Sequence, residues 1–241
     1  MPALAKPGSL GSVVDLVRRI KRGMKRAKPR ASYAQYAEDL VIGDILAALK
    51  ADARPGVYID VGANDPRRFS NTWRLYEHGW SGIAVEPDAD LCRKFARVRP
   101  RDAVVCAALG EREEELIFHR FFESALNTLD AGMAARAESD GWKVMSRESL
   151  RLRTLNAVLD EHHARISAGI DLLSIDAEGL DTAILRGLDL VRFRPRLIVF
   201  EVPPASKPGT GESAALLMAA GYALRARLFN SEMWLRCAAF S

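Results

Sequence analysis

The chain has 241 residues, of which 49% are hydrophobic and 27% are charged. A chain of this length buries a sizeable core, and its composition excludes an intrinsically disordered protein. No run approaches the roughly 20 apolar residues that cross a bilayer, which excludes a transmembrane span. Three scattered cysteines are too few for a disulfide framework or a zinc site.

The net charge of +4 is unevenly distributed. Residues 1–30 carry nine basic side chains and one acidic side chain, a net charge of +8, whereas the other 211 residues carry −4. Apolar residues recur at helical spacing over 13–24, so a basic amphipathic helix is predicted there. We expect residues 1–30 to be an arm and residues 31–241 to be a separate domain.

Such a helix favours peripheral contact of residues 10–30 with an anionic membrane surface, because each basic residue near that surface adds about 1 kcal/mol. Packing of the helix on the domain, or a merely solvated arm, are the alternatives. A nucleic-acid partner is disfavoured, because no aromatic residue stands among the basic ones to stack on bases.

The domain alternates segments typical of strands and of helices. Ser32 with Gln35 forms a capping-box pattern that predicts the start of a helix running to Leu49. Strands are predicted at 57–61, 82–85, 103–109, 171–175 and 197–201, with a closing pair at 222–229 and 233–239. Helices are predicted between them at 70–77, 88–97, 181–187 and 213–220. This alternation indicates an α/β fold whose mostly parallel sheet has an antiparallel edge.

The segment 111–150 interrupts this alternation. It contains a possible strand at 116–122 and a predicted helix at 129–137, and a further helix is predicted at 152–162. A connection of this length is typical of a lid or binding segment. We expect it to lie over the substrate.

Ligands of such a sheet bind at the carboxyl ends of the strands, so the residues that follow the strands are informative. Asp60 and Gly62 follow the first strand, and Glu86 ends the second. The G-x-G-x-x-G and phosphate-loop patterns are absent, which disfavours a phosphorylated cofactor. An acid at the second strand end is typical of a carboxylate that binds a ribose diol. These residues fit S-adenosylmethionine, and a tight turn between strand and helix is the structural alternative.

Six segments, in this order and spacing, resemble the FkbM-type S-adenosylmethionine-dependent methyltransferases. They are residues 32–40, 58–66, 69–72, 76–83, 85–87 and 171–179, so that the resemblance covers about residues 31–202. It implies a class I methyltransferase Rossmann-like fold with a seven-stranded sheet. It also implies methyl transfer to an oxygen, usually a hydroxyl of a sugar or of a polyketide-like natural product.

The resemblance assigns a cofactor site residue by residue. Its cofactor loop and ribose-binding acid correspond to Asp60, Gly62, Ala63, Asn64 and Glu86, with Pro87 directly after that acid. Gln35 is expected at the methionine end of the cofactor and Ala107 at the edge of the adenine ring.

Asp176 and Glu178 follow the fourth strand, where the transferred methyl group is expected. A carboxylate there aligns a hydroxyl acceptor and removes its proton, so Asp176 is the predicted base, with Glu178 beside it. Two alternatives stay open: both acids serve only the turn, or they hold Mg²⁺ together with Glu201. The predicted acceptor contacts are Ser70, Thr72, Ser124 and Asn127, although Ser70 also suits a helix cap.

The sequence therefore predicts a cytoplasmic S-adenosylmethionine-dependent O-methyltransferase that acts on a hydroxyl of a sugar, glycolipid or secondary metabolite. Its partners are a small-molecule or glycan acceptor and, through the arm, the inner face of a membrane. One alternative is an RNA methyltransferase that uses the basic arm. The other is a nucleoside-binding module without catalysis.

Overall fold

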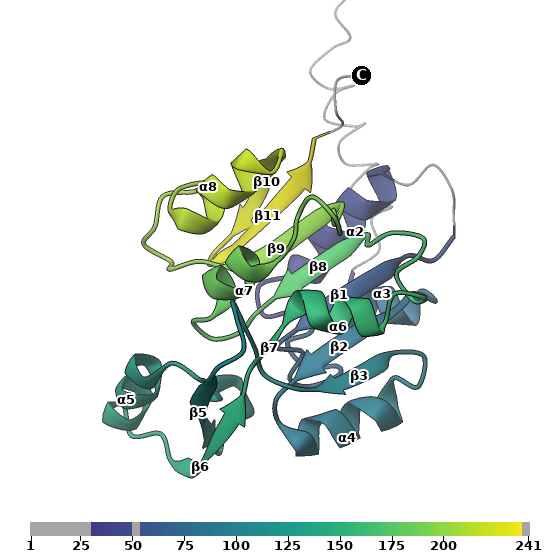
Figure 1. Cartoon of the computed structure of the whole chain (residues 1–241). Helices are drawn as coiled ribbons and strands as arrows, with labels where there is room; N and C mark the ends of the chain where they lie inside the picture. Colours follow the sequence, from purple (N-terminus) through teal and green to yellow (C-terminus); the bar gives the residue numbers. More distant parts are fainter. Residues whose placement is uncertain (1–29, 50–53, 238–241) are drawn as a thin grey trace, which may run out of the picture. The chain divides into compact units, whose positions relative to one another are not determined.

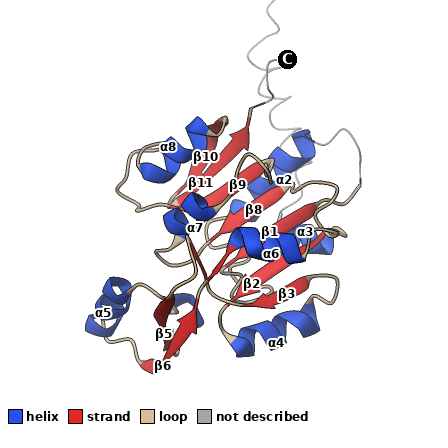
Figure 2. Ribbon diagram, in the orientation of Figure 1, coloured by secondary structure: helices blue, strands red, loops and turns tan. Residues whose placement is uncertain are grey.

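The computed structural model describes residues 30–49 and 54–237, and its centre is a seven-stranded sheet (Figures 1 and 2). The strand order is β10-β11-β9-β8-β1-β2-β3. The strands are β1 (Val57–Val61), β2 (Ser81–Glu86), β3 (Ala103–Cys106), β8 (Leu172–Ile175), β9 (Leu197–Glu201), β10 (Tyr222–Leu228) and β11 (Ser231–Arg236). Only β11 runs antiparallel to its neighbours, between β9 and β10. The predicted mostly parallel sheet with an antiparallel edge is confirmed.

Helices cover both faces of this sheet. The larger core cluster joins one face to α6 (Leu155–Glu161), α7 (Asp181–Gly187) and α8 (Glu212–Ala219). On the other face lie α2 (Glu38–Leu49), α3 (Trp73–Glu77) and α4 (Ala89–Val98). Because both faces are covered, the inner strands are almost continuously apolar, as a buried parallel sheet requires.

Several predicted element boundaries are wrong, and the helix predicted at 70–77 begins only at Trp73. The first helix begins at Glu38 and not after Ser32, whose hydroxyl donates to Asp39 Oδ1 at 2.6 Å instead of capping the helix. Ala37, at φ 68°, turns the chain into the helix. The third strand ends at Cys106, and the two residues of β4 (Leu109–Gly110) pair with β7 (Arg153–Thr154) outside the main sheet.

The segment 111–150 forms a unit of its own beside the main sheet (Figure 1). It consists of β5 (Glu115–Phe121), the short helix η1 (Ser124–Leu126) and α5 (Ala131–Ser139), and it continues into β6 (Val144–Arg151). The antiparallel pairing of β5 with β6 was not predicted, because the sequence of β6, VMSRESLR, is mostly polar. In the structure most side chains of this strand are exposed.

The closing hairpin turns at Phe229 and Asn230, one residue before the predicted turn, and Phe229 has φ 49°. The predicted arm helix lies outside the described residues, as does the end of the predicted last strand. Among the helices that the structure describes, none has the length and apolar character needed to cross a membrane.

Candidate active site

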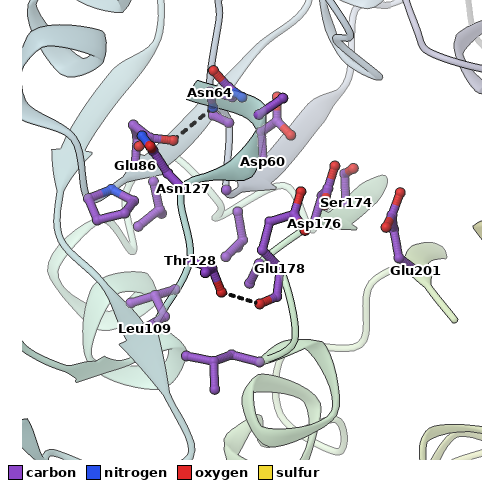
Figure 3. Close-up of a pocket in the computed structure, with 18 of the residues that line it drawn as sticks. Asp60, Asn64, Glu86, Leu109, Asn127, Thr128, Ser174, Asp176, Glu178 and Glu201 are labelled. Carbon is purple, nitrogen blue, oxygen red and sulfur yellow. Dashed lines mark hydrogen bonds between the residues drawn. The ribbon is translucent and has the colours of Figure 1, made fainter. Parts of the chain in front are cut away.

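A pocket of about 300 Å³ opens at the carboxyl ends of β1, β2, β8 and β9 (Figure 3). It gathers almost all of the residues that the sequence predicted for the site. The predicted residues that line it are Gln35, Asp60, Gly62, Ala63, Asn64, Ser70, Glu86, Pro87, Ala107, Ser124, Asn127, Asp176 and Glu178. Thr72 is the exception. Segments far apart in the chain therefore meet in one cavity.

The loop after β1 lies against the loop after β8 at Gly62. Gly62 has φ +71°, and a Cβ there would overlap the carbonyl oxygen of Asp176. The amide nitrogens of Gly62 and Ala63 donate to Val85 O at 2.9 and 3.1 Å. Glycine is thus required at this position by the packing of three strand ends, independently of any ligand.

Asp60 lies at the end of β1 and is 6% exposed. Thr72 donates its hydroxyl hydrogen bond to Asp60 Oδ2. Burial raises the pKa of Asp60 to about 6, whereas the Arg99 guanidinium and the Thr72 hydrogen bond act in the opposite direction. The prediction that Thr72 contacts the acceptor is wrong, because its side chain is fully buried behind Asp60 and does not line the pocket.

Glu86 shapes the turn on the other side of the pocket. Its Oε2 accepts a hydrogen bond from the Asn64 amide at 2.8 Å, and its Oε1 accepts one from the Asp88 amide at 2.9 Å. Burial raises the pKa of Glu86 to about 7. Each carboxylate oxygen keeps a second lone pair, so a ribose diol can still donate to this side chain.

Asp176 and Glu178 lie at the other end of the pocket, near Glu201 (Figure 3). Asp176 Oδ1 is buried and accepts no hydrogen bond from the described residues. Burial, followed by repulsion from Glu201 and Glu178, raises the pKa of Asp176 well above its ordinary value. Burial likewise raises the pKa of Glu178 to about 8 and that of Glu201 to about 7.

The other predicted acceptor residues already make hydrogen bonds within the protein. Ser70 Oγ accepts from the Trp73 amide at 3.0 Å, which is the capping alternative. Ser124 Oγ donates to Asn64 Oδ1 at 2.9 Å, and Asn127 Oδ1 accepts from the Phe121 amide at 2.8 Å. Contact of Ser70, Ser124 and Asn127 with an acceptor stays a prediction.

Several residues of the pocket were not singled out from the sequence. Asn71 donates to Ser174 Oγ at 3.1 Å, and both line the pocket together with Phe118 and Asn230. A polar residue inside the apolar strand β8 was an available signal for Ser174. Asn230 gives no such signal, because a hairpin turn commonly contains asparagine.

The alternative that Asp176 and Glu178 hold Mg²⁺ together with Glu201 receives no support from the described residues. Within the ranges that the structure describes, no three His, Cys, Asp or Glu side chains are grouped so as to hold a metal ion. The pocket instead fits a cationic nucleoside, because the buried acids Asp60 and Glu86 border it next to the small residues Ala63 and Ala107.

This strand order, with its single antiparallel strand, is the one expected of the class I methyltransferase fold. A family model described as the Methyltransferase FkbM domain matches residues 60–224, which is more than half of the chain. The chain belongs to the FkbM methyltransferase family. The predicted class of enzyme, a methyltransferase, is confirmed.

Solved structures of low identity resemble this fold. The FkbM methyltransferase of Methylobacillus flagellatus is 12% identical with a TM-score of 0.44, over 92% of this chain and 60% of that chain, so this chain spans less than two thirds of that protein. A TehB-like methyltransferase of Corynebacterium glutamicum is 10% identical with a TM-score of 0.42, over 92% of this chain and 97% of that chain. No curated protein matches the sequence.

Proposed function

We propose that this methyltransferase transfers the methyl group of S-adenosylmethionine to a hydroxyl oxygen of a sugar, glycolipid or secondary metabolite. The observation that carries the proposal is the buried Asp176 Oδ1, which lines the pocket and accepts no hydrogen bond from the described residues. A buried acceptor atom without a donor is costly, and a ligand hydroxyl supplies that donor.

The cofactor supplies a methyl group activated by a sulfonium charge, and the chain supplies alignment and a proton acceptor. In its ionised form, Asp176 accepts the hydrogen bond of the acceptor hydroxyl and takes its proton as the new bond to carbon forms. A carboxylate of raised pKa is a stronger base, which suits a hydroxyl of high pKa. Glu178, with a pKa of about 8, keeps its proton at pH 7 and donates a hydrogen bond to the acceptor.

The test combines binding and turnover. S-adenosylhomocysteine should bind the wild type in calorimetry, and Asp176→Asn should bind it with an affinity within about twofold of the wild type. With an acceptor that the wild type methylates, Asp176→Asn should lower kcat by about 100-fold, the usual contribution of a general base. The O-methyl product is identified by NMR.

Three outcomes would contradict the proposal. Absence of S-adenosylhomocysteine binding to the wild type rejects the site. An unchanged kcat in Asp176→Asn rejects the base. A product methylated at nitrogen rejects the hydroxyl acceptor. The exposed variant Glu161→Gln, on α6, is the matched control for the loss of an acidic side chain.

We also propose that the enzyme works in the cytoplasm with residues 10–30 on the inner face of a membrane. The support is the net charge of +8 in residues 1–30, which favours an anionic surface. The full chain should float with vesicles that contain anionic lipid, whereas a chain of residues 31–241 should not. Equal flotation of the two chains would reject membrane contact by the arm.

A further inference from the structure

Arg99 is a fully buried cation that bonds to the segment following the cofactor loop. It is the C-cap residue of α4 and is 0% exposed. Aromatic rings surround its guanidinium, which lies 4.5 Å from the Phe95 ring centroid and 5.3 Å from that of Trp73. A buried charge is costly unless it is paired and hydrogen-bonded, so the partners of Arg99 indicate its role.

Those partners lie in the segment that joins the cofactor loop to α3. Arg99 Nε donates to Pro66 O at 2.8 Å, Nη1 to Thr72 Oγ1 at 2.7 Å, and Nη2 to Ser70 Oγ at 2.7 Å. Asp102 Oδ2 lies 3.8 Å from Nη1 and completes the charge pair. One side chain thus fixes a carbonyl and two hydroxyls within seven consecutive residues.

The bond to Thr72 determines the direction of the next bond. Arginine only donates, so the Thr72 hydroxyl accepts from Arg99 and keeps its single proton for donation. The proton goes to Asp60, because Asp60 Oδ2 is nearer to the hydroxyl than Ser70 Oγ, which lies at 3.4 Å. This proton engages Asp60 Oδ2 and so sets the orientation of the carboxylate. Asp60 lines the pocket close to Asp176 (Figure 3).

We propose that Arg99 is a positioning residue for the methyl donor, which acts through the Thr72 hydroxyl to orient Asp60 toward the cationic part of the cofactor. The inference rests on the predicted cofactor contact of Asp60. Arg99 itself does not line the pocket, and its role is therefore distinct from direct ligand binding.

The charge of Arg99 adds an electrostatic effect to this orientation. Burial raises the pKa of Asp60 to about 6, and Arg99 opposes that rise more than any other group. Without Arg99 the pKa of Asp60 moves further up, so the carboxylate becomes protonated nearer to neutral pH. The other groups that interact with Asp60 are Thr72, Tyr58, Asp102, Glu86 and Asp176.

The first experiment measures the affinity of the full chain for S-adenosylhomocysteine by calorimetry between pH 5 and 8.5. The thioether of S-adenosylhomocysteine is neutral, but its α-ammonium group is a cation that an ionised Asp60 favours, so wild-type affinity should fall as the pH falls through about 6. Arg99→Met should move this fall upward by about one pH unit, which lowers the affinity about twofold at pH 7, about fivefold at pH 6 and about ninefold at pH 5. Arg101→Met is the matched control, because Arg101 contacts Tyr76 and not the cofactor loop.

A second pair of variants separates orientation from folding. Thr72→Val should weaken binding about 10-fold at pH 8, where Asp60 is ionised, because the carboxylate loses its fixed donor. Thr72→Ser keeps the hydroxyl and should restore wild-type affinity. In the Asp60→Asn background, Arg99→Met should leave the pH profile in place, because the shifting group is absent.

A wild-type pH profile in folded Arg99→Met, or wild-type affinity in Thr72→Val, overturns the positioning role. If Arg99→Met does not fold, the Thr72 pair decides alone. Failure of the wild type to bind S-adenosylhomocysteine at any pH rejects the proposed function, and this role with it, whereas binding that is insensitive to these variants rejects this role only.

Discussion

At Gly62, the loop after β1 lies against the carbonyl oxygen of Asp176, so one residue joins the ends of β1 and β8 beside the pocket. Its positive φ and the absence of a side chain serve the same contact. A neighbouring amide, that of Asp176, donates to Val61 O at 3.0 Å and closes the two loops against each other. A larger residue must separate the strand ends.

Gly62→Ala should therefore reduce both stability and binding. We expect a loss of more than about 2 kcal/mol in the free energy of unfolding, because steric overlap with a backbone atom adds to the strain of φ +71°. Urea denaturation measures the loss, and calorimetry with S-adenosylhomocysteine measures the accompanying fall in affinity.

Gly141→Ala is the control for backbone strain alone. Gly141 has φ +90°, but a Cβ there would meet nothing within 4 Å, so we expect a loss of about 1 kcal/mol. Equal losses in the two variants would show that the contact with Asp176 contributes nothing.

At the scale of elements, the unit formed by β5, η1, α5 and β6 brings lining residues to the pocket of a sheet that it does not join. Several contacts tie it to the loops after β1 and β2: Ser124 Oγ donates to Asn64 Oδ1, Arg120 Nε donates to Asp88 Oδ2 at 2.9 Å, and Arg68 pairs with Glu123. Asp88 is also the N-cap of α4, so the unit is bonded to the start of the helix that follows β2.

Ser124→Ala should loosen this unit without unfolding the sheet. Hydrogen exchange of the amides of 122–128 should become faster, and the KM for the acceptor should rise several-fold, because η1 loses its bond to the loop of Asn64. Ser146→Ala, on β6, removes the hydroxyl that donates to Glu148 and serves as the control. Identical exchange rates in both variants and the wild type would contradict a role for the Ser124–Asn64 bond.

At the scale of the whole molecule, the pocket concentrates buried acids with raised pKa values: Asp60, Glu86, Asp176, Glu178 and Glu201. Burial disfavours the charged form of these acids, so they bind protons more readily in the folded protein than in solvent. They gather in one pocket of a chain whose net charge is +4.

This arrangement predicts the pH dependence of stability. The pKa of Glu178 is about 8 in the folded state against an ordinary value of 4.5, so between these values the folded state binds more protons than the unfolded state. Its contribution is fully present below about pH 4.5 and is lost as the pH rises through 8. Urea denaturation should therefore show that Glu178→Gln stabilises the protein more at pH 8 than at pH 5.5.

Glu161→Gln, at the exposed end of α6, should change stability equally at both pH values within about 0.5 kcal/mol. A difference between wild type and Glu178→Gln that stays constant with pH would mean that Glu178 is not held protonated by its surroundings.

The sequence by itself determined the fold class, the order of the sheet strands along the chain and most of the pocket. It succeeded there because the signals are local: an apolar run ends at Asp60 or Glu86, and the carboxyl ends of parallel strands meet at one edge. It failed at Ser32 and at β6, because competing side-chain bonds and a polar strand leave no clear periodicity.

Only the tertiary structure decided the contacts between distant segments. It shows that Thr72 donates a hydrogen bond to Asp60, that Arg99 at the end of α4 bonds to the segment after the cofactor loop, and that Asn230 of the closing hairpin lines the pocket. Burial and neighbouring charge, which set the pKa values of the acids, depend on segments that approach one another only after folding. The spacing of residues along the chain does not show which distant segments approach one another. The pKa values of the acids and their hydrogen-bond partners therefore follow only from the folded structure.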